Sequence, residues 1–204
     1  TDDIQAYASA TYGHRSSQSY QNYRLPSSLN DYPGYQALYP WGYSPLETLN
    51  ENDYEVKAGL KGDFRGWHWD LSTVYGRDYD SIGLLNSANL QLNKDTGATP
   101  TKFDVMGFNN QQWTNDFDIS RKFHINGWPH SINVAGGASY RYEGYSVGTG
   151  SYNSTYGSGS DALAGTNSGN AGNYNRDVVA GYIDISTYLM KGLQLDLAGR
   201  EEHY

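Results

Sequence analysis

The stretch from Asn52 to Tyr79, NDYEVKAGLKGDFRGWHWDLSTVYGRDY, decides the fold because it contains two strands and the turn between them. On both sides of Arg65-Gly66, apolar or aromatic residues alternate with polar ones. A period of two residues is typical of a strand with one apolar and one polar face, whereas a helix would scatter the charges. The stretch therefore predicts a tight β-hairpin. The apolar parity of the first arm holds Tyr54, Val56, Ala58, Leu60 and Phe64, and that of the second arm holds Trp67, Trp69, Leu71, Thr73, Tyr75 and Tyr79.

The length of the two arms and the position of their aromatic residues indicate a membrane environment. Each arm runs to about a dozen residues, whereas strands of soluble proteins are usually about five or six residues long. Trp67 and Trp69 stand at the turn, and Tyr75 and Tyr79 stand further along the second arm. In outer-membrane barrels the apolar face meets lipid, aromatic girdles mark the two interfaces and the polar face lines a wet lumen. We therefore expect an antiparallel transmembrane β-barrel, with a soluble β-protein as the alternative.

The composition argues against several classes of protein. The 204 residues include 24 glycines, 20 tyrosines and no cysteine, and they carry a net charge of -8. Few of the residues are aliphatic, unlike in a soluble α/β enzyme. No apolar run is long enough for a transmembrane helix, but a barrel strand needs only about ten residues of alternating character. The acidic balance without a basic stripe argues against nucleic acid as a partner, and the lack of cysteine removes disulfides and thiolate metal sites.

The remainder of the chain repeats the strand pattern, with connections of unequal length. About seven strands are predicted, the first from Ile4 to about Tyr23. Outer-membrane barrels have short periplasmic turns and long extracellular loops. We therefore place the three long connections outside the cell. The short turns are predicted near Gly66, Gly127 and Gly192, and the long connections cover Arg24 to Asn50, Asp80 to Asn110 and Ser146 to Asn175.

Two of the long connections lead to local predictions. In the first, Ser44, Pro45 and Glu47 match a capping box with proline at the first helical position, which predicts a single helical turn. The connection from Ser146 to Asn175 has almost no aliphatic side chain with which to build a core. We therefore expect it to be mobile or to be ordered by a ligand.

The predicted strand count indicates an incomplete barrel. Bacterial single-chain barrels have even numbers of strands, whereas about seven are predicted in this chain. An open arc in lipid would leave two rows of backbone groups without hydrogen bonds, which is too costly to persist. We therefore expect residues 1–204 to be part of the β-barrel domain of a larger barrel.

Several stretches, taken together and in order, resemble the barrel domain of TonB-dependent outer-membrane receptors. They are Tyr43-Ser44-Pro45-Leu46 with Glu51-Asn52-Asp53-Tyr54, Gly59-Leu60-Lys61-Gly62 with Gly66-Trp67-His68-Trp69-Asp70-Leu71-Ser72, Tyr75-Gly76-Arg77-Asp78, Ile132 to Tyr145 with Tyr140-Arg141-Tyr142-Glu143, and Leu195-Asp196-Leu197-Ala198-Gly199-Arg200-Glu201-Glu202-His203-Tyr204. The resemblance implies a 22-stranded barrel with a plugged lumen, which takes up scarce solutes with energy from the TonB complex. A plug domain and a TonB-box segment have no counterpart in this sequence, so we expect it to correspond to a middle section of the barrel.

Three groups of residues are predicted to carry the function. The first comprises aromatic residues of the long loops, which are candidates to stack on a siderophore or a sugar, with loop packing as their alternative role: Tyr32, Tyr35, Tyr39, Trp41, Tyr43, Tyr152, Tyr156 and Tyr174. The second is expected to face the lumen, where it contacts an anionic substrate or the plug, or lines a solvated interior: Glu55, Lys57, Arg141 and Glu143. The third comprises the membrane-interface aromatics Trp67, Trp69, Tyr75, Tyr79, Tyr140 and Tyr142.

The sequence predicts no catalytic or metal site. The five histidines are dispersed along the chain, which is a poor arrangement for metal ligation. Paired acids such as Asp78 and Asp80 lack an accompanying nucleophile or base. No enzyme activity, cofactor or bound metal is therefore expected.

The leading hypothesis for function is TonB-driven uptake of a scarce solute across the bacterial outer membrane. Iron–siderophore complexes are the first candidates, followed by haem, cobalamin and oligosaccharides. The expected partners are outer-membrane lipid, the TonB complex through the plug region, and a small-molecule or oligosaccharide ligand. Two alternatives stay open. One is a passive porin or structural barrel, which needs no plug, and the other is a soluble protein that binds glycans through its tyrosine-rich loops.

Overall fold

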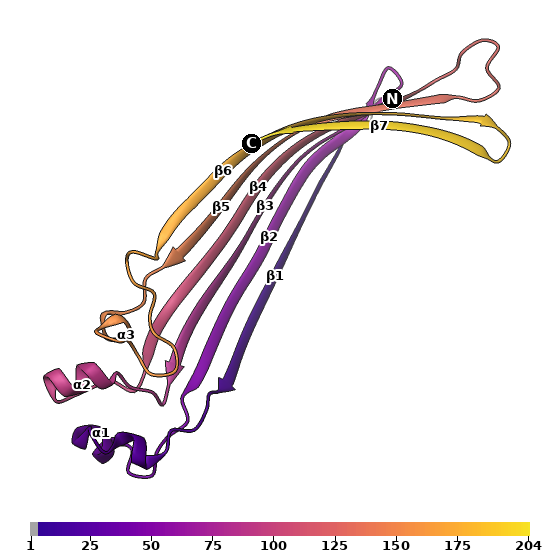
Figure 1. Ribbon diagram of the computed structural model, residues 1–204. Helices are drawn as coiled ribbons and strands as arrows, with labels where there is room; N and C mark the ends of the chain where they lie inside the picture. Colours follow the sequence, from indigo (N-terminus) through magenta and orange to yellow (C-terminus); the bar gives the residue numbers. More distant parts are fainter. Residues whose placement is uncertain (1–3) are drawn as a thin grey trace.

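One antiparallel sheet of seven strands forms the body of the molecule in the computed structural model, which describes residues 4–204 (Figure 1). The strands follow one another in the order of the sequence, so the predicted all-β antiparallel arrangement of seven strands is confirmed. Within residues 4–204 the sheet is open, with β1 and β7 as its edges. The strands are β1 (Ile4–Tyr20), β2 (Leu46–Phe64), β3 (Trp67–Leu85), β4 (Phe103–Phe123), β5 (Ile132–Gly148), β6 (Gly172–Met190) and β7 (Leu193–His203).

The three long connections between the strands contain short helical segments. These are η1 (Pro26–Leu29) and α1 (Pro33–Leu38) between β1 and β2, α2 (Leu90–Thr96) between β3 and β4, and α3 (Tyr152–Thr155) between β5 and β6. All three connections lie at one end of the sheet, and the turns lie at the other (Figure 1). In the part of the chain that the structure describes, no helix has the length and apolar character needed to span a bilayer.

The hairpin between β2 and β3 has the predicted position. Phe64 and Trp67 are the last pair of opposite residues before the turn, so the turn itself contains only Arg65 and Gly66. Both have positive φ angles, 51° for Arg65 and 82° for Gly66. Positive φ at both central residues is typical of a type I′ turn, whose twist matches that of the two strands it joins. The turn therefore fixes the register along both strands.

Strands β2 to β6 extend further toward the long connections than the sequence pattern indicates, whereas β1 ends at Tyr20 instead of about Tyr23. β3 continues to Leu85 and β4 begins at Phe103, so the second connection covers residues 86–102 instead of Asp80 to Asn110. The first and third connections cover residues 21–45 and 149–171. Residues 109–112 are four consecutive Asn and Gln residues that pair with both neighbouring strands. Because both faces are polar there, the alternation by which a strand is recognised is missing.

The helical turn predicted at Ser44, Pro45 and Glu47 is wrong. β2 begins at Leu46, and the carbonyl of Pro45 accepts a hydrogen bond of 2.8 Å from the backbone N–H of Gln21. This bond continues the β1–β2 ladder past the end of β1, so the chain is already extended where the capping box was expected. Proline begins helical segments further upstream in the same connection, at η1 and α1.

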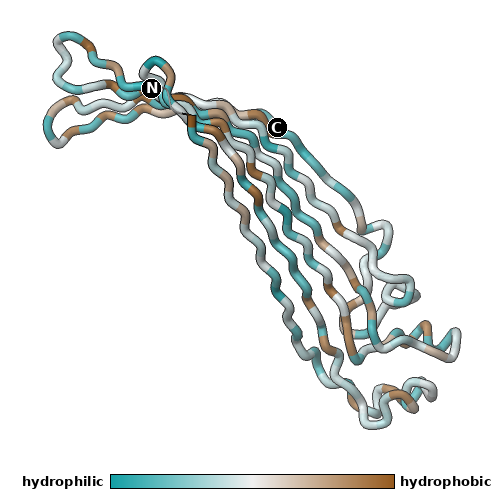
Figure 2. Tube along the Cα trace, turned by 180° about the vertical axis from the view of Figure 1, so that it is seen from behind, coloured by the Kyte–Doolittle hydropathy of each residue, from teal (hydrophilic) through white to brown (hydrophobic). Residues whose placement is uncertain are grey.

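The register separates apolar and polar side chains onto the two faces of the sheet. Neighbouring strands are paired continuously over most of their length, so side chains of one parity stay on one face across the sheet. The alternation is visible along the strands in Figure 2. No second layer of the described residues covers the apolar face. Nine of its large residues are therefore exposed by 40% to 61%: Val56, Leu60, Leu71, Phe117, Val179, Ile183, Ile185, Leu195 and Leu197.

Aromatic residues mark both ends of this apolar face. Some of these aromatic residues are paired across neighbouring strands, as Tyr12 on β1 and Tyr54 on β2 are. Others pack ring against ring, as Trp113 and Tyr140 do at a centroid distance of 6.3 Å. Between the two ends a strand contributes about 9–11 residues, which is the length that a barrel strand needs to cross a bilayer. The loop-side aromatic set is Tyr12, Tyr54, Tyr75, Trp113, Tyr140 and Tyr142, and the turn-side aromatic set is Phe64, Trp67, Trp69 and Phe123.

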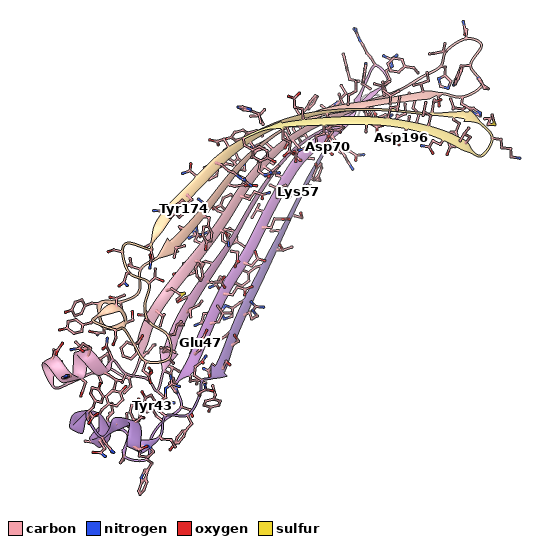
Figure 3. The ribbon with its side chains drawn as sticks, in the orientation of Figure 1. Tyr43, Glu47, Lys57, Asp70, Tyr174 and Asp196 are labelled. Atoms are coloured by element: carbon pink, nitrogen blue, oxygen red, sulfur yellow. The ribbon has the colours of Figure 1, made fainter. Side chains whose placement is uncertain are left out.

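On the polar face, a tyrosine ring lies across a glycine of the neighbouring strand. Tyr7 on β1 is opposite Gly59 on β2, and its hydroxyl donates a hydrogen bond of 2.5 Å to Asp70 Oδ1 on β3. Asp70 is labelled in Figure 3. A β-carbon at Gly59 would be 2.3 Å from the ring of Tyr7, so this close approach requires glycine. One side chain thereby connects three strands.

A second contact of the same kind lies on the opposite half of the sheet. Tyr182 on β6 is opposite Gly137 on β5, and its hydroxyl donates a hydrogen bond of 2.6 Å to Asp118 Oδ1 on β4. Asp118 and Asp70 are in turn opposite one another on β4 and β3. The two tyrosine contacts therefore span six neighbouring strands.

Replacing Gly137 with alanine is expected to lower the free energy of unfolding by about 1–3 kcal/mol, because overpacking forces neighbouring atoms to move. The new β-carbon would be 2.5 Å from the ring of Tyr182 and 2.7 Å from the carbonyl oxygen of Phe117. Gly13→Ala is the matched control on the same face, since nothing lies within 4 Å of the position its β-carbon would take. Urea titration of both variants checks the prediction, which fails if Gly13→Ala is equally destabilising.

Candidate functional site

Asp161 links the three long connections at the loop end of the sheet. Its carboxylate accepts hydrogen bonds from the Arg24 guanidinium at 3.0 and 3.2 Å and from the Tyr43 hydroxyl, both in the first connection. Its backbone carbonyl accepts a hydrogen bond of 2.6 Å from Ser87 Oγ, and its N–H donates one of 2.7 Å to the carbonyl of Ala88, both in the second connection. A single residue of the third connection therefore holds the other two.

Asn89 provides a second link between two of the connections. Its side chain is fully buried and donates to the carbonyls of Asn153 and Tyr156 at 2.9 and 2.8 Å. The same side chain accepts a hydrogen bond of 2.9 Å from the N–H of Leu92 and so caps the start of α2. The connection expected to be mobile or ordered by a ligand is thus held by contacts with its neighbours, although it has few aliphatic residues.

Four of the predicted ligand-binding tyrosines form the core of these connections. Tyr35 and Tyr43 are exposed by only 0% and 5%, and their hydroxyl oxygens are 3.1 Å apart. Tyr39 stacks on Tyr43 at a centroid distance of 4.3 Å and donates a hydrogen bond of 3.1 Å to the carbonyl of Ser87. Tyr32 packs against the same core. The rings of Tyr35 and Tyr43 therefore contact other loop residues and have no free face for a ligand.

The loop core favours neutral tyrosines and a charged Arg24. Burial raises the pKa of the Tyr35 hydroxyl, although the hydrogen bond with Tyr43 acts in the opposite direction. Burial and the hydrogen bond to Asp161 both raise the pKa of the Tyr43 hydroxyl, because an ionised tyrosine would stand beside the carboxylate. The hydrogen bond to Asp161 also raises the pKa of Arg24, because it favours the charged guanidinium.

The other predicted loop aromatics are more accessible. Trp41, Tyr152 and Tyr174 are exposed by 81%, 69% and 62%. Tyr156 is half-buried, with its ring 5.5 Å from that of Tyr152 and its hydroxyl donating a hydrogen bond of 3.0 Å to Asp95. Ligand contact by Trp41, Tyr152 and Tyr174 stays a prediction, and Tyr174 has the most suitable position because it borders the groove on the polar face.

This groove has a volume of about 630 Å³ and extends from β1 to β6. Sites for small molecules usually measure about 300–1,000 Å³. On β2 it lies between Glu47, near the loop end, and Lys57, both labelled in Figure 3. Its lining combines carboxylates, amides, tyrosine rings and two arginines, Arg77 and Arg176, which are groups that bind a polar solute. The charged residues Asp53, Glu55, Asp78, Glu143 and Arg176 are among its lining residues, together with Tyr174.

The four predicted lumen residues all lie on the polar face, but only some of them meet at the groove. Glu55 and Glu143 line it, and Arg141 lies beside it with its Nε 2.7 Å from Glu143 Oε1. Lys57 is further toward the turn end, where its ammonium group lies 5.7 Å from the ring centroid of Tyr7. The groove therefore brings together residues from opposite halves of the sheet that the sequence left unconnected.

The predicted interface aromatics lie on the apolar face, and all but one belong to the two aromatic sets. Trp67 and Trp69 are in the turn-side set, whereas Tyr75, Tyr140 and Tyr142 are in the loop-side set. Tyr79 is on the same face but is opposite Asn52 on β2 and Asn109 on β4, beyond the end of the apolar band. Its surroundings are therefore polar.

Asp53, Asp78 and Arg176 line the groove but were not predicted as site residues from the sequence. The alternation of apolar and polar residues places Asp53 and Asp78 on the polar face, so the face of each residue could be predicted from the sequence. That the two carboxylates are opposite one another depends on the register of β2 and β3. The pair formed by Arg24 and Asp161 joins residues 137 positions apart and leaves no local pattern.

Comparisons with known proteins gave no relative. A scan against models of known protein families found no match, and neither curated proteins nor solved structures yielded one. Among the side chains of residues 4–204, no three His, Cys, Asp or Glu are arranged to hold a metal ion. The geometry described above is therefore the basis for assigning a function.

Asp161→Ala is expected to loosen the contact between the first and third connections, because it removes the carboxylate that binds Arg24 and the buried Tyr43 hydroxyl. The backbone hydrogen bonds of residue 161 to Ser87 and Ala88 in the second connection are kept in the variant. Loss of the hydrogen bonds to the carboxylate should lower the local free energy of opening by about 1–3 kcal/mol. Hydrogen–deuterium exchange should then become faster in residues 21–45 and 149–171, and change less in residues 86–102. Asp31→Ala, which removes an exposed carboxylate of the first connection, is the control. Faster exchange confined to the third connection would contradict the role of Asp161.

Alkaline pH is expected to open the loop core. A tyrosine side chain in the unfolded chain has a pKa of about 10. In the folded loops the pKa values of Tyr35 and Tyr43 are raised above this value. Their stabilising contribution is thus complete below about pH 10 and declines as the pH rises toward the raised values. A short pulse of protease between about pH 8 and pH 11 measures the opening. Tyr43→Phe should show a weaker pH dependence of cleavage, and an unchanged dependence would refute the explanation.

Proposed function

We propose that this chain is part of the wall of a bacterial outer-membrane β-barrel, and that the barrel is a TonB-dependent receptor that takes up a scarce solute. An iron–siderophore complex is the first candidate, and haem, cobalamin and oligosaccharides follow. The observation that carries the proposal is the exposed apolar face with an aromatic set at each end, on a sheet whose other face is polar. Soluble proteins rarely expose such a large apolar surface, whereas a bilayer covers it.

The two edges of the sheet support a larger barrel. Within residues 4–204, β1 pairs only with β2 and β7 pairs only with β6. Each edge therefore presents a row of backbone N–H and C=O groups, and each unsatisfied group in hydrocarbon costs several kcal/mol. A sheet in a bilayer needs further strands at both edges, as in the 22-stranded barrel that the resemblance implies.

The difference between the two ends of the sheet supports a receptor. Long connections pack together at one end, and the two-residue hairpin turn of β2 and β3 lies at the other (Figure 1). In an outer-membrane barrel the long loops face the medium. The groove lies on the loop side of the apolar band, so a solute that passes the loops would reach it first. Binding and passage of a solute, without chemical conversion, are the activity proposed here.

The test uses the full-length gene product in a Gram-negative host that lacks its own siderophore receptors. Under iron limitation the protein is expected to fractionate with the outer membrane and to restore uptake of radioactive iron from at least one ferric siderophore. Deletion of TonB is expected to abolish this uptake. Uptake that persists without TonB would identify a passive porin. A monodisperse monomer in the absence of detergent would contradict the membrane location and favour the soluble glycan-binding protein.

A further inference from the structure

One half of the groove, the acidic half, carries three carboxylates. Arg77 on β3 also lines this half, but it has the parity of the apolar face, opposite Tyr54, and its Nε donates a hydrogen bond to Asn109 Oδ1. Asp53 on β2 is directly opposite Asp78 on β3, and Glu55 follows Asp53 on the same face. Like charges that are directly opposite in a sheet repel one another. Among the described residues, no basic side chain forms an ion pair with Asp53, Glu55 or Asp78; the nearby Arg15 pairs with Glu51. A cation in the groove would relieve this repulsion.

The basic side chains in the other half are already engaged by protein groups. Arg176 on β6 pairs with Glu143, which is directly opposite on β5, and its guanidinium lies 5.2 Å from the ring centroid of Tyr204. Arg141 pairs with the same carboxylate, with 2.7 Å between its Nε and Glu143 Oε1. An anionic solute would have to displace Glu143 from these arginines and would also meet the repulsion of the acidic half.

Tyrosine rings border the same groove. Tyr174 on β6 is opposite Tyr145 on β5, and both line it. Tyr174 is exposed by 62% and Tyr145 by 41%, so their rings are accessible to a solute. The face of an aromatic ring attracts organic cations. Carboxylates and ring faces, the two kinds of group that bind an ammonium ion, are therefore present in one cavity of about 630 Å³.

From this distribution of charge we infer that the groove binds solutes that carry a positive charge, such as a ferric chelate with a free ammonium group, and excludes anionic chelates. The inference rests on the proposed uptake function and adds the charge class of the solute. The acidic half supplies the selectivity, whereas on the opposite wall Glu143 offsets one of the two charges of Arg141 and Arg176 and occupies both guanidinium groups.

Two ferric trihydroxamates of nearly the same shape test the inference. Ferrioxamine B has one free ammonium group, and in its N-acetyl derivative that group is neutral. The full-length protein in detergent, titrated with each complex by isothermal calorimetry, is expected to bind the ammonium form about tenfold more tightly. In the double variant Asp53→Asn with Asp78→Asn, the preference is expected to fall to about twofold or less.

The control variant combines Asp63→Asn with Asp196→Asn. It removes the same number of carboxylates from the same face, but near the turns, and Asp196 is labelled there in Figure 3. It is expected to keep the full preference for the ammonium form. Equal affinity for the two complexes, a preference that survives in the Asp53 and Asp78 variant, or no binding of either complex would overturn the inference.

TonB-dependent uptake of the same two complexes separates this inference from the proposed function. A charge preference in binding without TonB-dependent uptake would contradict the proposed function and leave the inference in place. TonB-dependent uptake of both complexes at the same rate, with equal affinities, would support the receptor and contradict the charge selection.

Discussion

Backbone pairing between neighbouring strands is the constraint on which the rest of the molecule depends. The interior strands are hydrogen-bonded on both sides, and the pairing slips only between Ile82 and Gly83 on β3 and between Tyr188 and Met190 on β6. Since successive side chains point to opposite faces, one register assigns every residue to a face. The apolar band, its aromatic ends and the polar groove all follow from that assignment. A shift of one residue in β2 would bring Glu55 and Lys57 to the apolar face.

The sequence was sufficient to predict the parts of the fold where one face is apolar and the other polar. The β2–β3 hairpin and the parity of its side chains could be predicted for this reason. Beyond the apolar band both faces are polar, so residues such as Asn109 and Asn110 show no alternation, and the predicted loop from Asp80 to Asn110 includes them. The polar face of Glu55 and Glu143 could also be predicted, whereas the opposition of Asp53 and Asp78 requires the register. The loop contacts of Asp161 reach residues more than a hundred positions away and are invisible in any local pattern.

Tyrosine occurs in three different environments, which explains its abundance in a chain with few aliphatic residues. In the loops, Tyr35 and Tyr43 supply a buried core while their hydroxyls hydrogen-bond. On the apolar face, Tyr54 and Tyr75 mark the end of the band, with ring centroids 6.0 Å apart. On the polar face, Tyr7 and Tyr182 cover glycines and reach a carboxylate on the next strand. An apolar ring with a polar tip suits all three environments.

The link through Asp161 has a consequence for how the sequences of the three long connections can change in evolution. The tips of the three connections form one surface, because the position of each depends on hydrogen bonds to the other two. In the proposed receptor, an antibody or a phage that recognises the tip of one connection would therefore bind a shape that residues of all three connections determine. A substitution at Arg24 or Ser87 would change the shape of that epitope even where the binder does not contact Arg24 or Ser87. Substitutions that would prevent this recognition therefore include the positions that stabilise the loop structure. A change in the sequence of one connection consequently requires matching changes in the other two.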